Sequence, residues 1–159
     1  MSFNFSVISN KNIVLAVTGC IAAYKSAILV RRLKDAGFNV RVVMTQGAQA
    51  FITPLTFQAL SGNPVHTELL NPEAEAGMGH IELARWADLL LVAPASCDIL
   101  AKFAAGLADD LLSTLYLATP CPVWVVPAMN QQMWAAKATQ RNLNTLVEDG
   151  VHVIMPDAG

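Results

Sequence analysis

The chain has 159 residues, of which 54% are hydrophobic and only 14% are charged, and its formal charge at pH 7 is -2. This length is enough for one domain with a substantial core. No cluster of Lys and Arg supplies the basic face that nucleic-acid binding needs, so nucleic acid is excluded as the main partner. The high apolar fraction indicates that part of the surface is buried between subunits.

Neither a membrane span nor a secretory leader is visible in the sequence. The longest apolar runs lie around residues 89–95 and 122–129 and are interrupted by proline. They are far shorter than the roughly 20 residues that cross a bilayer, so we expect a cytoplasmic protein. The cysteines Cys20, Cys97 and Cys121 lack metal-ligand spacing, which predicts reduced, buried thiols and no metal site.

Taken in order, the chain alternates apolar strand-like runs with amphipathic helical segments. Residues 1–11 are polar and predict a loose amino-terminal arm. The apolar run 13–17 predicts a buried strand, and a helix is expected over 22–35, ending at Gly37. Residues 40–44 predict a second strand, which completes a right-handed βαβ unit.

The middle of the chain is less regular. A helical stretch is predicted over 48–60, with a restart at Pro54. Residues 63–79 contain two prolines and three carboxylates, and they predict a short strand followed by a long surface loop. A brief helix over 80–86 and a third strong strand over 89–93 follow.

The last third of the chain continues the same alternation. Helices are predicted over 99–105 and 110–118, followed by a strand over 123–126. One long helix is expected from residue 131 to near residue 150, and a last strand over 152–155.

The alternation βαβα is unbroken, and no repeat or linker interrupts it. It predicts one α/β domain over residues 12–159, a three-layer α/β/α Rossmann-like fold with a parallel sheet. In such a sheet the carboxyl ends of the strands form the ligand crevice. Four turns converge on this edge, and they span residues 18–21, 45–47, 95–98 and 128–130.

Two of these turns place small residues and a hydroxyl at the amino end of a helix. Backbone N–H groups and the helix dipole can hold a phosphate there without a basic cluster. The first turn has a single glycine, Gly19, and lacks the G-x-G-x-x-G dinucleotide fingerprint, which favours a mononucleotide such as FMN. Gly19 and Ser96 are also compatible with ordinary turn and capping roles.

Residues 127–134, Pro-Ala-Met-Asn-Gln-Gln-Met-Trp, join a strand to the long helix. Asn130, flanked by thioethers and an indole, stands where a flat, partly apolar ligand would lie. The same residues also fit a structural role, with Asn130 as the helix N-cap and Met129, Met133 and Trp134 in the core.

His80 is the best acid–base candidate in the sequence. It lies between the irregular loop and a short helix, where it can overhang the crevice, and imidazole titrates near neutral pH. His66 and His152 have no motif around them and are interpreted as structural. Asp109 and Asp110 precede an apolar helical run and fit a helix start better than a catalytic pair.

Three segments together resemble a known family. They are Pro-x-Met-Asn-x-x-Met-Trp at 127–134, Gly-His-Ile-Glu-Leu at 79–83 with Trp-Ala-Asp at 86–88, and Ala-Pro-Ala-Ser at 93–96. From Asn12 onward the chain resembles the homo-oligomeric flavin-containing cysteine decarboxylases. It is most similar to the members that decarboxylate 4′-phosphopantothenoylcysteine to 4′-phosphopantetheine in coenzyme A biosynthesis, in particular to the amino-terminal half of the bacterial bifunctional enzymes.

The resemblance implies roles for the residues that match these motifs. His80 would be the catalytic base, Asn130 would hold the substrate carboxylate, and Met133 would lie beside the substrate. The cofactor is FMN, and no metal is implied. Contacts to FMN are implied for Gly19, Cys20, Ile21, Thr45, Gln46, Gly47, Ser96, Cys97, Asp98, Ile99 and Ala128.

The implied chemistry accounts for these residue types. A simple cysteine carboxylate does not readily lose CO2, because the resulting carbanion has no electron sink, and oxidation of the thiol-bearing carbon by FMN provides one. His80 would take the proton that accompanies this oxidation. The amide of Asn130 would orient the carboxylate without a full positive charge that stabilises it against leaving.

The chain departs from the family pattern at two places. Family members continue after the last strand into a flexible flap with a cysteine that protonates the enethiol intermediate, whereas this chain ends at residues 156–159. We therefore expect a fragment without the flap, which binds FMN and stalls at the enethiol. The turn at 96–98 reads Ser-Cys-Asp where some relatives have Ser-Ala-Asn, which leaves the FMN contacts of Cys97 and Asp98 open.

The resemblance also implies partners. Family members form trimers with the flavin site at a subunit boundary, and bacterial members build dodecamers from these trimers. The full-length protein would also carry a phosphopantothenate–cysteine ligase domain. Two alternatives remain open, a peptidyl-cysteine decarboxylase of lantibiotic maturation and a non-enzymatic regulatory subunit that keeps the flavin fold.

Overall fold

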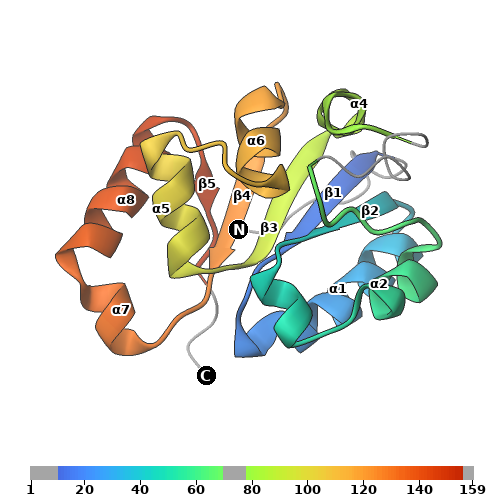
Figure 1. The fold of residues 1–159 in the computed structure, drawn as a ribbon, viewed down its shortest axis with the longest axis horizontal. Helices are drawn as coiled ribbons and strands as arrows, with labels where there is room; N and C mark the ends of the chain where they lie inside the picture. Colours follow the sequence, from blue (N-terminus) through green and yellow to red (C-terminus); the bar gives the residue numbers. More distant parts are fainter. Residues whose placement is uncertain (1–10, 70–77, 156–159) are drawn as a thin grey trace.

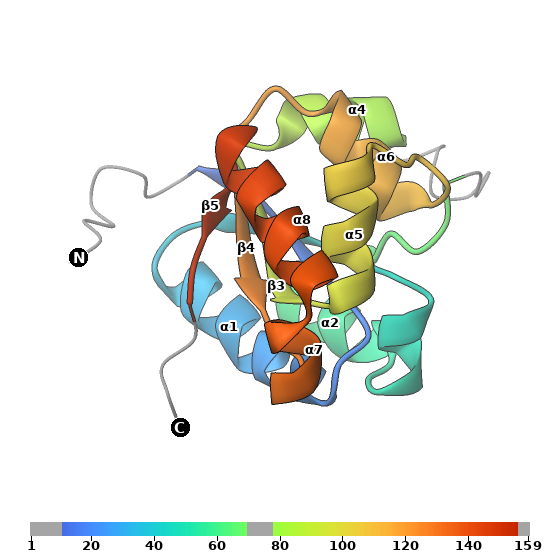
Figure 2. The same cartoon turned by 90° about the vertical axis from the view of Figure 1, so that its left-hand side faces the viewer.

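The computed structural model describes residues 11–69 and 78–155. They form a five-stranded parallel sheet in the order β2-β1-β3-β4-β5, with helices on both faces (Figures 1 and 2). The predicted three-layer α/β/α fold with a parallel sheet is confirmed. Apart from Lys11, the predicted arm lies outside the described residues. Within the described part of the chain, no helix has the length and apolar character needed to cross a membrane.

The central strands are buried on both faces, which is why they form continuous apolar runs in the sequence. In β1, Val14 and Ala16 pack into the core on one face of the sheet, and Leu15 and Val17 pack into the core on the other. The strands are β1 (Asn12–Val17), β2 (Asn39–Met44), β3 (Leu89–Ala95), β4 (Val123–Pro127) and β5 (His152–Val153).

The helices divide between the two faces. The elements α1 and α2 cover one face through Val30, Leu33 and Phe57, and α4, α5, α6 and α8 cover the other through residues such as Leu83 and Phe103 (Figure 1). The helical elements are η2 (Ile21–Ala23), α1 (Tyr24–Asp35), η3 (Gly47–Ala50), α2 (Pro54–Ser61), α4 (His80–Trp86), α5 (Cys97–Ala105), α6 (Leu111–Ala118), α7 (Gln131–Ala135) and α8 (Lys137–Glu148).

Several predicted elements differ in detail, and the last strand spans His152–Val153 instead of 152–155. The single long helix after β4 is two helices, because Ala136 leaves the helical region with a ψ of 137°. The side chain of Gln140 donates to the freed Trp134 carbonyl at 2.7 Å. The short strand expected within residues 63–79 is a single bridge between His66 and Val43, and residues 70–77 lie outside the described part.

The carboxyl edge is shaped by where the helices begin. The helix α5 begins at Cys97, two residues earlier than predicted, because the Ser96 hydroxyl caps its first turn. The start of α5 decides which of its backbone N–H groups face the ligand edge of the sheet.

The left-handed backbone predicted at Gly37, after the end of α1, is present, with a φ of 97°.

Candidate functional site at the carboxyl edge of the sheet

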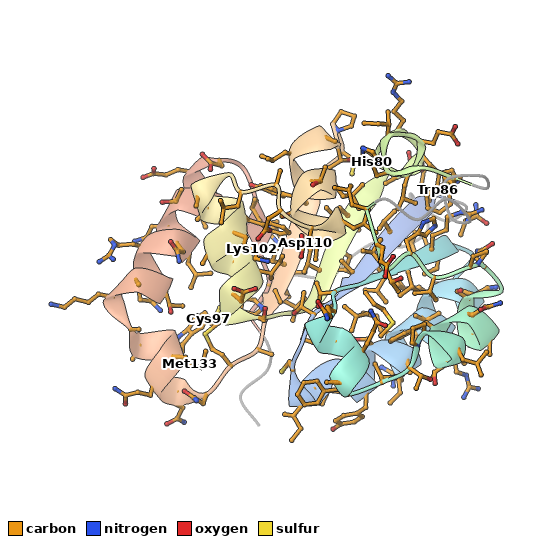
Figure 3. All side chains as sticks on the ribbon, in the orientation of Figure 1. His80, Trp86, Cys97, Lys102, Asp110 and Met133 are labelled. Atoms are coloured by element: carbon orange, nitrogen blue, oxygen red, sulfur yellow. The ribbon has the colours of Figure 1, made fainter. Side chains whose placement is uncertain are left out.

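The predicted site residues fall into two groups (Figure 3). Cys97 and Met133 lie at the carboxyl edge of the sheet, with Lys102 close to them, whereas His80 lies near Trp86 on α4. Figures 1 and 2 both place α4 and α7 at opposite ends of the molecule.

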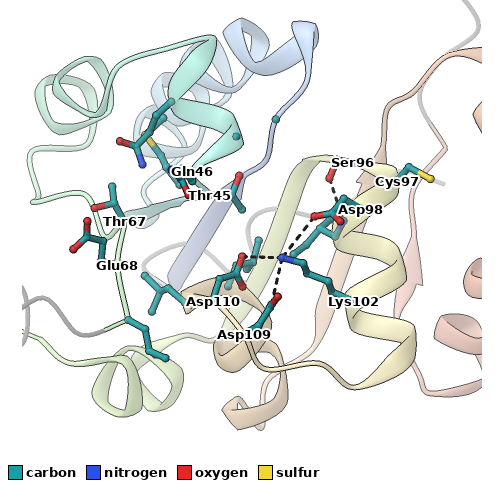
Figure 4. Close-up of a pocket in the computed structure, with 18 of the residues that line it drawn as sticks. Thr45, Gln46, Thr67, Glu68, Ser96, Cys97, Asp98, Lys102, Asp109 and Asp110 are labelled. Carbon is teal, nitrogen blue, oxygen red and sulfur yellow. Dashed lines mark hydrogen bonds and ion pairs between the residues drawn. The ribbon is translucent and has the colours of Figure 1, made fainter.

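A cavity of about 860 Å³ lies at the carboxyl edge (Figure 4). Residues that follow β1, β2 and β3 line it, as the convergence of parallel strand ends predicts. The predicted site residues that line it are Gly19, Thr45, Gln46, Gly47, Ser96, Cys97, Asp98, Ile99 and Met133. The predicted residues that do not line it are Cys20, Ile21, His80, Ala128 and Asn130.

The turns after β1 and β3 are joined by a buried hydroxyl. The Thr18 hydroxyl donates to the Pro94 carbonyl at 2.6 Å and accepts from the Ser96 backbone N–H at 2.8 Å. Thr18 is only 1% exposed, so these bonds are shielded from water. Sequence reasoning missed this role, although a hydroxyl at the end of a buried strand was its visible signal.

The turns after β1 and β2 meet backbone to backbone. A Cβ added at Gly19 would lie 3.0 Å from the carbonyl carbon of Gly47, which is tighter than nine in ten real Cβ contacts, so the Gly47 backbone would have to shift. The same addition at Gly47 would meet the Gly19 Cα at an ordinary 3.6 Å. Gly19 is therefore required by this close approach, which forms one wall of the cavity.

The amino end of α5 forms the opposite wall. The Ser96 hydroxyl accepts from the Ile99 N–H at 3.1 Å, which satisfies one donor of the first turn. The N–H groups of Cys97 and Asp98 belong to the same first turn and have no intrahelical acceptor, because no preceding turn exists. Such amides, together with the helix dipole, make an anion-binding end.

Lys102 links this wall to the start of α6 (Figure 4). Its Nζ lies 3.7 Å from Asp98, 3.3 Å from Asp109 and 3.6 Å from Asp110. Burial by itself would lower the pKa of Lys102, but the hydrogen bond that its ammonium donates to Asp109 and the three carboxylate charges raise it above its ordinary value. Sequence reasoning missed this cluster, whose one signal was the i,i+4 spacing of Asp98 and Lys102.

Asp110 is also the N-cap of α6. Its side chain accepts from the Ser113 N–H at 2.8 Å, and the Ser113 hydroxyl accepts from the Asp110 N–H at 3.1 Å, which completes a capping box. The predicted capping role of the Asp109–Asp110 pair is confirmed for Asp110. Both carboxylates nevertheless line the cavity.

Asn130 lies beside the cavity rather than in its wall. Its Oδ1 accepts from the Met133 N–H at 2.8 Å, so its capping role is confirmed. Met133 is 43% exposed and reaches the cavity. The Ala128 N–H donates to the Ala95 carbonyl at 3.0 Å, which fixes the strand that carries this turn.

His80 is the first residue of α4 and is partly buried. The helix ends at Trp86, just before the Asp88 N–H donates to the Asn12 carbonyl at the amino end of β1. The guanidinium carbon of Arg41 lies 5.5 Å from the Trp86 ring centroid. Folding of one chain therefore does not bring His80 into the wall of the cavity that the strand-end turns form.

The three cysteines are free, as predicted, but partly exposed rather than buried. The Cys97 sulfur lies 3.5 Å from the Thr139 hydroxyl oxygen, and Cys121 lies 3.0 Å from that of Thr119. Burial raises the pKa of the Cys121 thiol. Among the residues that the structure describes, no three His, Cys, Asp or Glu side chains are grouped to hold a metal ion.

A parallel sheet with small-residue turns and a capped helix start at its carboxyl edge defines an α/β domain for a nucleotide-like ligand. The family model described as Flavoprotein matches residues 5–159, and the chain belongs to this family. The coenzyme A biosynthesis bifunctional protein CoaBC of Escherichia coli (strain K12) is 59% identical over 152 residues. This match covers 96% of the chain but 37% of the relative.

Solved structures agree with this membership. The FMN-dependent cysteine decarboxylase SpaF superposes with a TM-score of 0.88 at 34% identity, covering 96% of this chain and 87% of that one. A PPC decarboxylase variant complexed with pantothenoylaminoethenethiol gives a TM-score of 0.76 at 34% identity, covering 91% of this chain and 81% of that one.

Proposed function

We propose that the chain is an FMN-dependent decarboxylase that converts 4′-phosphopantothenoylcysteine to 4′-phosphopantetheine in coenzyme A biosynthesis, in the cytoplasm. The observation that carries this proposal is the cavity of about 860 Å³ built from three strand-end turns. Its size lies within the range of cofactor pockets, about 300–1,000 Å³. Family membership and the similarity to CoaBC proteins and to PPC decarboxylase support the choice of reaction.

The residues of the cavity fit FMN. The Gly19–Gly47 contact makes a cradle that one added methyl group would fill. The first-turn amides of Cys97 and Asp98 offer donors to a phosphate. Among the other predicted contacts, Thr45, Gln46, Ser96 and Ile99 line the cavity, and Cys20, Ile21 and Ala128 adjoin it in the chain.

Bound FMN supplies the two-electron oxidation that gives the cysteine carboxylate an electron sink. Asn130 orients the substrate carboxylate through its Nδ2 amide, because its Oδ1 is held by the Met133 N–H. Met133 contributes an apolar contact at the cavity mouth. His80 accepts the proton that leaves the substrate during the oxidation.

His80 reaches the reacting atoms from a second copy of the chain. Support comes from its absence from the cavity wall of one chain. Exposed large apolar side chains on the segments that follow the turns after β1 and β2 also support a subunit boundary, with exposed fractions of 80% at Ile21, 54% at Phe51 and 71% at Leu55. A closed ring of heterologous contacts, such as a trimer, places one subunit boundary beside the cavity of every chain. Such trimers can assemble further into a dodecamer.

The similar CoaBC proteins are much longer than this chain, which spans 37% of the Escherichia coli relative. Because those relatives are named bifunctional, we propose that the full-length protein carries a second, phosphopantothenate–cysteine ligase activity. Ligation of cysteine would then supply the substrate of the decarboxylase.

Absorbance spectroscopy and CO2 release test the proposal. The purified chain is expected to bind FMN with perturbed flavin bands and to release labelled CO2 from carboxyl-labelled 4′-phosphopantothenoylcysteine. Mass spectrometry then separates full conversion, which gives a product lighter by CO2 alone, from the stall at the enethiol expected without the flap cysteine, which gives a product lighter by CO2 and two hydrogens. A chain that binds FMN without releasing CO2 would contradict the reaction, and a chain that cannot be loaded with FMN would contradict the site.

A peptidyl-cysteine decarboxylase is the second candidate. The higher TM-score with SpaF than with the PPC decarboxylase variant, 0.88 against 0.76, favours it. A competition assay with a peptide that ends in cysteine separates the two. We expect 4′-phosphopantothenoylcysteine to be decarboxylated and the peptide to be left intact, whereas the reverse preference would establish the second candidate.

A further inference from the structure

The charges that line the cavity are unbalanced. Lys102 is the single cationic side chain among the described residues that line it. Four carboxylates line it as well, from Glu68, Asp98, Asp109 and Asp110. One positive charge therefore faces four negative charges in a cavity that we propose holds a dianionic phosphate.

Lys102 is held where its charge acts on the cavity. Three carboxylates lie within 3.7 Å of its Nζ, and its side chain is only 20% exposed. The same three carboxylates raise the pKa of Lys102, although burial opposes them, so the ammonium stays charged at neutral pH. A charge in this partly shielded position is less screened than one on an open surface.

Two of the carboxylates around Lys102 also stabilise helix ends. Asp110 caps α6 through Ser113, and Asp98 lies in the first turn of α5, where a negative charge interacts favourably with the helix dipole. These helix ends therefore need carboxylates in the same place where an anionic ligand would be repelled. Lys102 offsets this conflict by neutralising part of the acidic wall.

We propose that Lys102 is a specificity-determining residue, whose charge lets the acidic cavity accept a phosphorylated flavin and makes it prefer FMN to riboflavin. This inference rests on the proposed FMN-dependent function. It predicts an effect on the phosphate alone, because riboflavin shares the ring and the ribityl chain of FMN and lacks its charge.

The test is a titration of the flavin-free chain with FMN and, separately, with riboflavin, followed by flavin fluorescence. The variant Lys102→Met is expected to weaken FMN binding about tenfold, as loss of one nearby unit charge implies, and to change riboflavin binding less than about twofold. Lys102→Arg keeps the charge and is expected to retain the preference. The difference between the flavins should shrink in 0.5 M salt.

A matched control removes a lysine elsewhere. Lys34 donates to the Ser61 carbonyl at 2.7 Å and does not line the cavity, so Lys34→Met is expected to leave the preference unchanged. Asp109→Asn is expected to change FMN binding in the opposite direction, and its result does not depend on whether Lys102→Met folds. It removes one negative charge from the wall and is expected to strengthen FMN binding about threefold.

Equal weakening of FMN and riboflavin binding in Lys102→Met would show that Lys102 only holds the helices together, and would overturn the inference. Unchanged FMN binding in both Lys102→Met and Asp109→Asn would also overturn it. A wild-type chain that binds both flavins equally would overturn the inference while leaving a flavin site in place. A wild-type chain that binds neither flavin would overturn the proposed function as well.

Discussion

The two ends of the sheet are built in different ways. At the carboxyl edge, short turns, a glycine pair and a capped helix start enclose a cavity within one chain. Toward α4, the chain carries the acid–base candidate His80 next to a packed, partly exposed Trp86. The comparison shows that the cavity-forming turns and the candidate base lie in separate parts of one chain, which is why we propose that a second copy supplies His80.

The largest expected effect separates chemistry from cofactor binding. His80→Gln removes the proposed base, so CO2 release should fall at least about 100-fold, the usual contribution of general base catalysis. FMN binding should be unchanged, because His80 does not line the cavity. Parallel assays of labelled CO2 and flavin content check this. A variant that loses its FMN would place His80 in the cofactor site instead.

A substitution at Gly19 is expected to disrupt cofactor binding at the carboxyl edge. Gly19→Ala places a Cβ 3.0 Å from the Gly47 carbonyl carbon, so the turn at Gly47 must shift and FMN binding should weaken by about tenfold. Gly47→Ala is the matched control, since its Cβ meets the Gly19 Cα at 3.6 Å, and a smaller loss is expected. Fluorescence titration measures both. Equal losses would contradict the close-approach account.

Capping of α5 contributes a smaller, structural effect. Ser96→Ala removes the acceptor of the Ile99 N–H, and the free energy of unfolding should fall by about 1 kcal/mol. Thr53→Ala, at the N-cap of α2 where no side-chain capping bond is made, should cost less than about 0.5 kcal/mol. Urea denaturation measures the two values, and an equal cost for both would contradict a specific cap at Ser96.

The smallest effect concerns pH. Burial, and then the charge of Arg41, lower the pKa of His66, which is 5% exposed. As the pH drops below about 6.5, His66 takes up a proton more readily in the unfolded chain than in the folded one, so the free energy of unfolding falls. The slope for one such group cannot exceed about 1.4 kcal/mol per pH unit. Urea denaturation at pH 7, 6 and 5 measures this slope, and His66→Gln should flatten it. An unchanged slope in the variant would contradict the assignment to His66.

Most of the fold could be predicted because local patterns decide it. Buried parallel strands need continuous apolar runs, and Gly37 ends its helix where a positive φ is required. The break at Ala136 was missed because alanine favours helix, and the break depends on contacts such as Gln140 with Trp134.

The site was predictable to the extent that the fold brings strand ends together. Three turns meet in one cavity because parallel strands end on one edge. The Lys102 cluster was missed because its partners Asp109 and Asp110 come from the next helix start, which sequence spacing does not reveal. The separation of His80 from the cavity depends on how α4 packs, and a motif carries no information about that.

Subunit complementation tests most directly whether two copies build one active site. His80→Gln chains keep Asn130, and Asn130→Ala chains keep His80, so each variant alone should be nearly inactive. When the two are produced together in equal amounts and mix at random, about one boundary in four joins an intact Asn130 to an intact His80. We therefore expect recovery of about a quarter of the wild-type rate of CO2 release. No recovery in mixed oligomers that retain FMN would contradict it, since both residues would then act within the same chain.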